Sequence, residues 1–392
     1  MTFVSGVEVL TAQLPFRFSF GHALAERRSS TNIYVKLTLA DGAVGYGEGV
    51  PREYVTGETE ESALETLCDR YVPALLGREL LAPEDVPATL DEVARETTPP
   101  GQPVTGAAWC ALELALLDAA GKHFRRSVQH WLGPLQAPVV RYDAVVPFSS
   151  PRKLAALALL IRLLGFKQVK IKVGSDLRKD LRSLRILRRF LGPGADLRVD
   201  ANCGWTADEA LAAIARLRPY GISAVEQPVP AGDLEGLRRV TAATPELIMV
   251  DESLRTVEEA EELARQRACD AFNIRVSKCG GLLNSVRIAR IAADAGLTCV
   301  VGAQVGESGI LSAAGRHLAA TIAPRYVEGS AGRLLLKEDL TVENVLPGWG
   351  GRARPYRGAG LGVRVKEATL RKYGQTSRSF EATTVKRGER VS

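Results

Sequence analysis

The pattern of apolar and polar residues changes near residue 134. Before that point, Val4–Gln13 and Thr31–Ala40 are β-rich runs that predict two strands. Asp41-Gly42 then predicts a tight hairpin turn into a third strand, Ala43–Gly49. Helical spacing follows over Glu60–Leu76, Pro87–Glu96 and Thr105–Ala120. Residues 1–133 are therefore expected to form an α+β domain.

Beyond Gly133-Pro134, short β-rich runs alternate with amphipathic helices. The expected strands are Val139–Val146, Gln168–Val173, Asp196–Asp200, Ala224–Glu226, Leu247–Val250, Ala271–Arg275 and Thr298–Val301. The expected helices are Arg152–Leu164, Asp176–Phe190, Ala207–Leu217, Asp233–Ala242, Val257–Arg265, Leu283–Ala295 and Ser308–Thr321. This alternation predicts a parallel sheet with helices outside it. Seven or eight such units over about 190 residues favour a closed α/β barrel, residues 134–326, over an open sheet.

The chain beyond Tyr326 is Gly-rich and irregular, and residues 327–370 are expected to return to the first domain. From Arg371 to Ser392 there are six basic and two acidic residues, so this segment carries +4 of the formal net charge of +6. The rest of the chain is near neutral and has no stripe of aromatic and basic residues. We expect residues 371–392 to be a solvated, mobile tail and not an arm that binds nucleic acid.

The composition is that of an ordinary globular protein, with 46% hydrophobic and 24% charged residues among 392. It excludes a disordered, collagen-like or coiled-coil protein. No apolar run reaches the roughly 18–20 residues that span a bilayer. The first residues, Met1–Ser5, lack the basic start and apolar core of a signal peptide. We therefore expect a cytoplasmic protein without a membrane partner.

Cysteine and histidine show no metal-binding pattern. The six cysteines form no Cys-x-x-Cys pair, so buried, reduced thiols are expected. The four histidines show no His-x-x-x-His spacing. Any metal ion in this protein would therefore be held by oxygen.

Three acidic residues stand at the ends of consecutive predicted strands. Asp200 and Glu226 each end a strand and Asp251 directly follows one, at separations of 26 and 25 residues, about one βα unit each. The carboxyl ends of parallel strands meet on one face of a barrel, where sites are built. Three carboxylates would repel one another there, and a hard divalent cation such as Mg²⁺ or Mn²⁺ would relieve the repulsion. The alternative is that each acid caps the helix that follows its strand.

Lys170 and Lys172 lie two residues apart in the predicted strand Gln168–Val173, so both side chains point to the same side. If that side is the barrel interior, each ammonium lowers the pKa of the other, and desolvation lowers both further. One lysine would then be a neutral amine near pH 7, as a general base requires. The alternative is that both lysines face outward and their apolar neighbours fill the core.

As an ordered set, the motifs of this chain resemble those of the enolase superfamily, in particular its muconate-lactonizing subgroup, over nearly the whole length. They are Gly45-Tyr46-Gly47-Glu48, Lys170-x-Lys172, Asp200-x-Asn202, Glu226-Gln227-Pro228, Asp251-Glu252-Ser253 and Gly280-Gly281. The resemblance implies a capping domain and a (β/α)₇β barrel, with Mg²⁺ on Asp200, Glu226 and Asp251. It implies that Lys172 is the acid/base and that Lys170 tunes it. The chemistry that this family shares is abstraction of a proton next to a carboxylate, which gives an enediolate that a divalent cation stabilises.

Position 275 departs from the pattern of that subgroup, which usually carries a second lysine there in an Asn-x-Lys context. This chain has Asn273-Ile274-Arg275 instead. Arginine stays protonated and takes no proton at neutral pH. Racemases and epimerases need an acid/base on each face of the substrate carbon, whereas syn eliminations and cycloisomerisations need only one. Arg275 therefore favours one-base chemistry, and Lys278 in the following loop is the alternative second base.

Further features concern the substrate. Glu307, after the seventh strand, either binds substrate, as a glutamate of the subgroup does in this turn, or begins the next helix. Asn202, from the motif that contains Asp200, is expected to contact substrate. After the eighth strand, Val327-Glu328-Gly329-Ser330 stands in place of the Asp-x-Asp with which dipeptide epimerases of the subgroup bind an α-ammonium group. This counts against a dipeptide substrate.

Specificity in the family resides in capping-domain loops, which here would be Ser19–Ser30 and Pro51–Thr59. The basic residues of these loops would receive a second anionic group, as in a dicarboxylate, or would be solvated surface charges. They are His22, Arg27, Arg28 and Arg52.

The expected function is that of a Mg²⁺-dependent enzyme that makes an enediolate from a small carboxylate substrate. A cycloisomerase of muconate-lactonizing type or a related one-base syn lyase is the first interpretation. A racemase or epimerase of N-acylamino acids or dipeptides on the same scaffold is the alternative. A barrel aldolase that forms a Schiff base on Lys172 is a third, and a non-catalytic barrel, against which the acids and the lysine pair weigh, is a fourth. The resemblance also implies a homo-oligomer.

Overall fold

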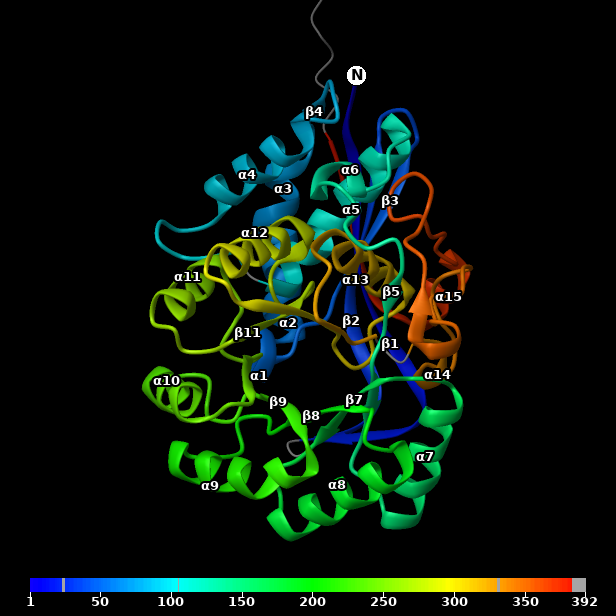
Figure 1. Ribbon diagram of the computed structural model, residues 1–392. Helices are drawn as coiled ribbons and strands as arrows, with labels where there is room; N and C mark the ends of the chain where they lie inside the picture. Colours follow the sequence, from blue (N-terminus) through cyan, green and yellow to red (C-terminus); the bar gives the residue numbers. More distant parts are fainter. Residues whose placement is uncertain (23–24, 105, 330–331, 383–392) are drawn as a thin grey trace, which may run out of the picture.

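The structure is a computed structural model that describes residues 1–22, 25–104, 106–329 and 332–382. An antiparallel sheet covered by helices forms the N-terminal part, and a curled parallel sheet surrounded by helices forms the larger part (Figure 1). The expected α/β barrel with an α+β capping domain is therefore confirmed.

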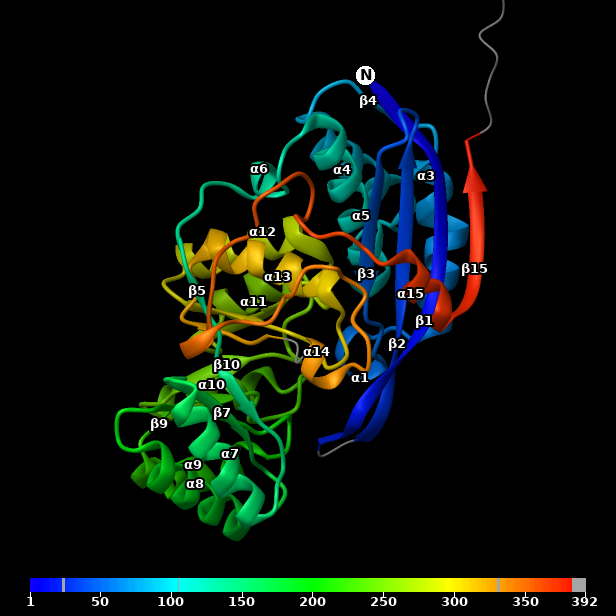
Figure 2. The same cartoon turned by 90° about the vertical axis from the view of Figure 1, so that its right-hand side faces the viewer.

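The sheet of the capping domain has the order β15-β1-β2-β3, and β4 pairs with the start of β1. Its strands are β1 (Thr2–His22), β2 (Ala25–Leu39), β3 (Val44–Gly49), β4 (Glu79–Leu80) and β15 (Gly374–Glu381). The expectation of a loop over Ser19–Ser30 is wrong, because β1 and β2 continue as a hairpin in which Phe20 pairs with Arg27. The alternation Phe-Arg-Phe-Ser-Phe at positions 16–20 has the period of a strand and predicts this extension. Figure 2 shows the hairpin reaching from the sheet toward the barrel.

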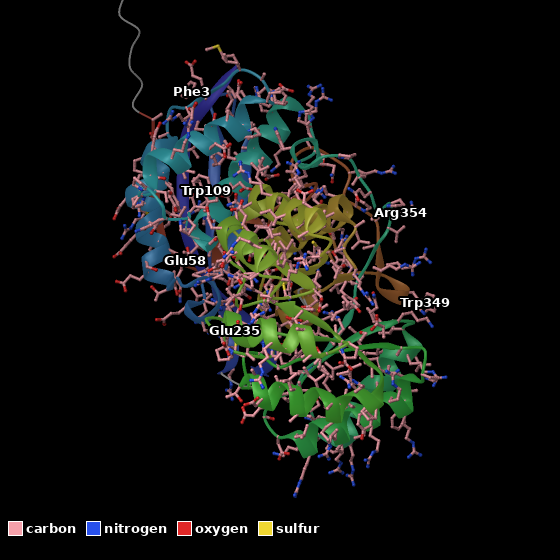
Figure 3. The ribbon with its side chains drawn as sticks, turned by 60° about the vertical axis from the view of Figure 1, so that its left-hand side comes forward. Phe3, Glu58, Trp109, Glu235, Trp349 and Arg354 are labelled. Atoms are coloured by element: carbon pink, nitrogen blue, oxygen red, sulfur yellow. The ribbon has the colours of Figure 1, made fainter. Side chains whose placement is uncertain are left out.

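The helices of the capping domain are α1 (Glu53–Thr56), α2 (Glu60–Thr66), the π-helix η1 (Leu67–Tyr71), α3 (Val72–Leu75), α4 (Asp85–Thr97), α5 (Gly106–Phe124) and α6 (Gln129–Leu132). Of these, α5 and α2 pack against the sheet of this domain, and α6 packs against the barrel helices α12 (Gly281–Asp294) and α13 (Gly309–Ile322). Helix α5 is apolar on nearly all sides and buried over most of its length. The carboxylate of Glu58 caps it, accepting the N–H groups of Ala107 at 2.7 Å and Ala108 at 3.0 Å (Figure 3).

The barrel sheet contains eight strands in sequence order, and each neighbouring pair is parallel. They are β6 (Ala144–Val146), β7 (Gln168–Lys172), β8 (Asp196–Asp200), β9 (Ile222–Glu226), β10 (Leu247–Val250), β11 (Ala271–Arg275), β12 (Thr298–Gly302) and β13 (Tyr326–Val327). The N–H of Asp143, just before β6, donates to the carbonyl of Val327 in β13 at 2.7 Å. This bond brings the last strand beside the segment that leads into the first.

Seven helices follow the barrel strands at nearly the expected positions. They are α7 (Pro151–Leu163), α8 (Leu177–Leu191), α9 (Ala207–Leu217), α10 (Leu234–Ala243), α11 (Val257–Arg265), α12 (Gly281–Asp294) and α13 (Gly309–Ile322), with a 3₁₀ turn, η2 (Arg218–Tyr220), after α9. Helix α12 also packs against α5, and α13 against β3. These contacts join the barrel to the capping domain (Figure 2).

The C-terminal segment returns to the capping domain. Its elements are α14 (Gly332–Leu335), η3 (Trp349–Gly351), β14 (Arg352–Ala353), which pairs with β5 (Val140–Arg141), and α15 (Glu367–Tyr373). Glu367 accepts hydrogen bonds from Lys36 at 2.6 Å and from the Tyr46 hydroxyl at 3.1 Å.

The expectation of a mobile tail from residue 371 is wrong for Arg371–Glu381. These residues form the end of α15 and strand β15, which pairs antiparallel with β1. The edge of β1 offers unpaired backbone groups that a further strand satisfies, and Arg371 forms an ion pair with Glu8 at 2.5 Å. Residues 383–392 lie outside the described residues.

In the described part of the chain, no helix combines the length and apolar character needed to cross a membrane. All six cysteines are free thiols, as expected, but only four are buried; Cys203 and Cys299 are partly exposed.

Candidate active site

The three acidic residues expected to hold a metal ion lie together at the carboxyl ends of adjacent barrel strands. Asp200 is the last residue of β8 and Glu226 the last of β9, and the two are register partners. Asp251 directly follows β10. All three side chains are buried. The prediction that acids at the carboxyl ends of parallel barrel strands lie on one face is therefore correct for the positions of these three residues.

Lys170 of β7 faces the barrel interior. Its Nζ donates to both oxygens of Glu226, at 3.0 and 3.1 Å, and to Glu328 at 2.8 Å. Burial alone would lower the pKa of Lys170, but Glu226, Glu328 and Asp200 raise it above its ordinary value. The expectation that Lys170 has a depressed pKa is therefore wrong, because the three carboxylates outweigh burial and the charge of Arg198.

Lys172 lies at the end of the same strand and is bound less tightly. Its Nζ donates to Oδ1 of Asn202 at 2.5 Å and lies 3.5 Å from Oδ2 of Asp200. Its side chain keeps 12% of its surface exposed, against 4% for Lys170. Both lysines line the cavity described below, and Lys172 is the more exposed of the two.

Arg275 ends β11 and reaches the acidic residues from the other side of the barrel. Its guanidinium pairs with Oδ2 of Asp251 and lies 3.8 Å from Oε1 of Glu226. Burial alone would lower its pKa, but Asp251 and Glu226 raise it, so Arg275 is held in its charged form. It takes no proton near neutral pH.

Lys278 is buried below this site. Its Nζ donates to the carbonyl of Asp251 at 2.5 Å, to Oδ1 of Asp251 at 2.8 Å and to the carbonyl of Asn273 at 3.0 Å. It does not line the cavity described below. Its three oxygen partners and its place outside the cavity wall count against the alternative that Lys278 serves as a second base.

A cavity of about 170 Å³ opens over the strand ends. The barrel contributes Lys172, Asn202 and Arg275 to its wall, and the capping domain contributes Arg27, Arg52 and Tyr54. The cavity therefore lies between the two parts of the chain, and the hairpin of β1 and β2 brings Arg27 to it.

Arg27 and Arg52 form a cationic corner of this cavity. Arg52 donates to the carbonyls of Pro51 at 2.6 Å and Thr31 at 3.1 Å. Burial and the nearby charge of Arg27 lower the pKa of Arg52 to about 10. Among the described residues, neither guanidinium has a carboxylate partner within 4.0 Å. An anionic group of a ligand would relieve the repulsion between the two arginines.

The other expected substrate contacts differ in their positions. Asn202 lines the cavity, and its Nδ2 donates to Glu252 at 3.3 Å. Glu307 does not line it: Glu307 accepts the N–H of Gln304 at 2.6 Å, and burial raises its pKa to about 8. Glu307 directly precedes Ser308, the N-cap residue of α13. The backbone of His22 ends β1, and its side chain lies outside the described residues.

Sequence reasoning missed a buried charge network beneath the site. Arg198 of β8 is fully buried; it donates to Glu328 at 3.1 Å, pairs with Asp143 and lies over the ring of Tyr326 at 4.3 Å. Arg198 stands two residues before Asp200, so strand periodicity predicts that both point into the barrel. Glu328 directly follows β13, so it lies at the carboxyl end of a parallel barrel strand as the other acids do. These two signals were present in the sequence.

The carboxylate set suits a hard divalent ion in its chemistry, since Asp200, Glu226 and Asp251 offer only oxygen. Burial and the charge of Asp200 raise the pKa of Glu226, although Lys170 opposes the shift. This repulsion is what a divalent cation would relieve. Within the described residues, no three His, Cys, Asp or Glu side chains could hold a metal ion as they stand. Lys170 and Arg275 contact the oxygens of these carboxylates, and both side chains would have to move before a metal ion could bind there.

Family models match both parts of the chain. Residues 3–133 match "Mandelate racemase / muconate lactonizing enzyme, N-terminal domain", and residues 153–369 match "Enolase C-terminal domain-like".

Solved structures agree with this assignment over nearly the whole chain. An N-succinyl Arg/Lys racemase from Bacillus cereus has a TM-score of 0.88 at 29% identity, over 97% of this chain and 100% of that one. A dipeptide epimerase from Enterococcus faecalis, complexed with Mg and the dipeptide L-Leu-L-Tyr, has 0.82 at 30%, over 92% and 99%. A muconate lactonizing enzyme from Pseudomonas fluorescens, complexed with muconolactone, has 0.85 at 27%, over 95% and 100%.

Relatives matched by sequence at 29–33% identity carry the names of epimerases or racemases. These names favour the alternative of a racemase or epimerase over a cycloisomerase of muconate-lactonizing type. Together with the matches to both parts of the chain, they show that the protein belongs to the enolase superfamily, in its mandelate racemase and muconate lactonizing enzyme family.

Proposed function

We propose that this chain takes a proton from the carbon next to a substrate carboxylate, with Lys172 as the base and Mg²⁺ held by Asp200, Glu226 and Asp251. The observation that carries the proposal is the position of Lys172, which lines the cavity beside the buried carboxylates and whose ion pair with Asp200, at 3.5 Å, is longer than those of Lys170 with Glu226 and Glu328. The Mg in the related Enterococcus faecalis structure supports the choice of metal. Mn²⁺ would suit the same oxygen ligands.

We propose an N-acylamino acid with a second anionic group as the substrate class. The relatives' names include dipeptides and N-succinylated amino acids. Arg27 and Arg52 supply a cationic corner in the cavity, which suits the distal carboxylate of an N-succinyl group. The segment after β13 has Glu328, which is bound to Lys170 and Arg198, and lacks the Asp-x-Asp expected for an α-ammonium. These contacts favour the N-acyl substrate over a dipeptide.

In this proposal each residue has a separate task. The amine of Lys172 accepts the α-proton while the Asn202 side chain holds its Nζ. Lys170 remains an ammonium and balances the charge of Glu328. Arg275 places a positive charge on the far side of the cavity. Mg²⁺, when bound, supplies positive charge to the oxygens on which negative charge develops.

The fate of the enediolate separates two candidate activities. Epimerisation or racemisation is favoured by the names of the relatives and requires a proton carrier on the second face of the carbon. A one-base elimination or cyclisation is favoured by Arg275, which cannot exchange a proton as a lysine does. Both activities share the first step at Lys172.

Proton NMR in D₂O with Mg²⁺ tests the proposal. The substrate panel holds N-succinylamino acids of both configurations, dipeptides and muconates. Exchange of the α-proton, lost on chelation, supports Mg²⁺-dependent abstraction. Exchange with inversion identifies an epimerase, whereas a new product or exchange of one enantiomer alone identifies one-base chemistry. Turnover that survives chelation would instead support Schiff-base chemistry at Lys172 and overturn the metal site.

A further inference from the structure

Arg275 contacts two of the three carboxylates that we propose as metal ligands. Its guanidinium pairs with Oδ2 of Asp251 and lies 3.8 Å from Oε1 of Glu226. Lys278 lies 2.8 Å from Oδ1, the other oxygen of Asp251. Both oxygens of Asp251 thus have cationic partners, and an incoming ion has to take one of them.

Strand β12 is shaped to admit this arginine. Gly302 is the register partner of Arg275 in the barrel sheet. A Cβ atom at position 302 would lie 2.9 Å from Cγ of Arg275 and 2.2 Å from Oδ1 of Asn273. The glycine therefore leaves the space that the long side chain of Arg275 needs beside the strand ends.

The cavity also offers the guanidinium other acceptors. Oε2 of Glu252 and Oε1 of Gln304 are buried and accept no hydrogen bond from any described residue, and both residues line the cavity with Arg275. Nε of Arg275 likewise has no hydrogen-bond partner in the described part of the chain. A second arrangement, in which Arg275 has left Asp251 for these oxygens, would satisfy buried groups that the first leaves unpaired.

We propose that Arg275 is a positioning residue that competes with the metal ion for Asp251. Binding of the metal ion displaces the guanidinium of Arg275 from Asp251 toward Glu252 and Gln304. Because of this competition, the affinity for the metal ion is lower than the three carboxylates alone would give. The inference rests on the proposed metal site. When only one of two arrangements binds a ligand, the apparent affinity falls by the fraction of protein in that arrangement. The fixed positive charge of Arg275 also opposes a divalent ion nearby.

Calorimetric titration of the full chain with Mg²⁺ tests this inference. The variants are Arg275→Met and Arg275→Gln, and Arg52→Met is the matched control, because it removes a guanidinium from the same cavity that contacts no proposed ligand. We expect both variants at 275 to bind Mg²⁺ about tenfold more tightly than the wild type. The control variant is expected to bind it as the wild type does.

Thermal melting supplies a second readout that does not depend on activity. In chelator, Arg275→Met is expected to melt below the wild type, because Asp251 and Glu226 lose a compensating charge. Added Mg²⁺ is expected to raise its Tm more than that of the wild type. Arg275→Gln retains a donor for Asp251 and keeps the comparison possible if Arg275→Met does not fold in chelator.

The results of these titrations test the competition between Arg275 and the metal ion separately from the proposed metal site. Equal or weaker Mg²⁺ binding by both variants at 275 overturns the competition, and weaker binding would mean that Arg275 organises the ligands. If the wild type and both variants bind no Mg²⁺, or if Asp200→Asn binds it as well as the wild type, the proposed metal site is itself wrong.

Discussion

Lys172 and Arg275 face one cavity from β7 and β11, which are four strands apart in the eight-stranded sheet. In a barrel of eight strands this is the largest separation possible, so the two side chains approach a ligand from opposite sides. A lysine can serve as a base when its surroundings favour the amine, whereas an arginine keeps its proton. The site is therefore asymmetric, with a base on one side and a fixed cation on the other.

Replacement of Lys172 is expected to abolish α-proton exchange. Lys172→Met removes the amine but keeps the length of the side chain, so we expect a loss of at least about 10³-fold, typical of a general base. Deuterium incorporation followed by NMR measures the loss, and circular dichroism checks the fold. Lys179→Met, at an exposed lysine of α8, is the control. Exchange that persists in Lys172→Met would remove Lys172 from the mechanism.

Replacement of Arg275 by lysine is expected to add a second proton carrier. Arg275→Lys keeps the positive charge when protonated but introduces a group that can lose its proton. We expect exchange of the enantiomer that the wild type leaves untouched, while exchange on the Lys172 side continues. If the wild type already exchanges both enantiomers, another group is the second base and the role assigned to Arg275 is wrong.

Arg52 is expected to bind the second anionic group of the substrate. A hydrogen bond to a charged partner contributes about 1.5–3 kcal/mol, so Arg52→Met should lower kcat/KM for an N-succinyl substrate about 10- to 100-fold, mostly through KM. An N-acetyl analogue, which lacks the distal carboxylate, should lose less than about threefold by the same reasoning. Arg28→Met, at an exposed arginine of the β1–β2 hairpin, is the control. Equal losses with both substrates would show that Arg52 supports the loop and not the ligand.

The barrel is predictable from sequence because its signals are local and repeated. Each strand carries an apolar run, each helix an apolar stripe, and the acids fall one βα unit apart, so these patterns alone place Asp200, Glu226 and Asp251 on one face. The same rules reach Arg198 and Glu328. Arginine is rarely buried in a protein core, however. The residue type of Arg198 therefore predicts an exposed position, whereas strand periodicity predicts an interior one.

The remaining differences between the sequence-based predictions and the structure depend on contacts between segments that are distant in the sequence. Pairing of β15 with the edge of β1 joins residues more than 360 positions apart, and the charge of Arg371 gives no sign of its partner Glu8. Likewise, burial would lower the pKa of Lys170, but Glu226 and Glu328, which lie 56 and 158 positions further along the chain, raise it. A local sequence pattern does not show how strongly such distant carboxylates act on Lys170, so it predicts a lowered pKa where the structure gives a raised one.

His317 is expected to make stability depend on pH in the acid range. It is buried in α13, where its Nε2 faces the carbonyl of Leu361 at 3.1 Å, and burial lowers its pKa to about 4 from the ordinary 6.5. The native state therefore binds fewer protons than the unfolded state below pH 6.5. This contribution is complete above pH 6.5 and is lost as the pH falls toward 4, by up to about 3 kcal/mol.

Urea unfolding between pH 4 and 7 measures this dependence. His317→Gln keeps an N–H donor for Leu361 but does not titrate, so its free energy of unfolding should change less over this range than that of the wild type. Curves that stay parallel would show that His317 is not the group responsible.

Gly47 is expected to be required for the contact between β3 and α5. A Cβ atom at position 47 would lie 1.9 Å from the carbonyl oxygen of Ala111, a backbone atom that no neighbouring side-chain substitution can remove. Gly47→Ala should therefore separate strand and helix and lower the free energy of unfolding by about 3 kcal/mol or more. Gly194→Ala is the control, because a Cβ there meets nothing within 4 Å.

The same substitution should also weaken the site. Next to Gly47, Glu48 accepts the N–H of Ser308 at 2.8 Å and its hydroxyl at 2.7 Å, and so ties β3 to the start of α13 in the barrel. A displaced β3 would shift the capping domain over the cavity, and KM should rise more than kcat falls. A variant that is destabilised but keeps the wild-type KM would show that the two parts hold their relative position without this bond.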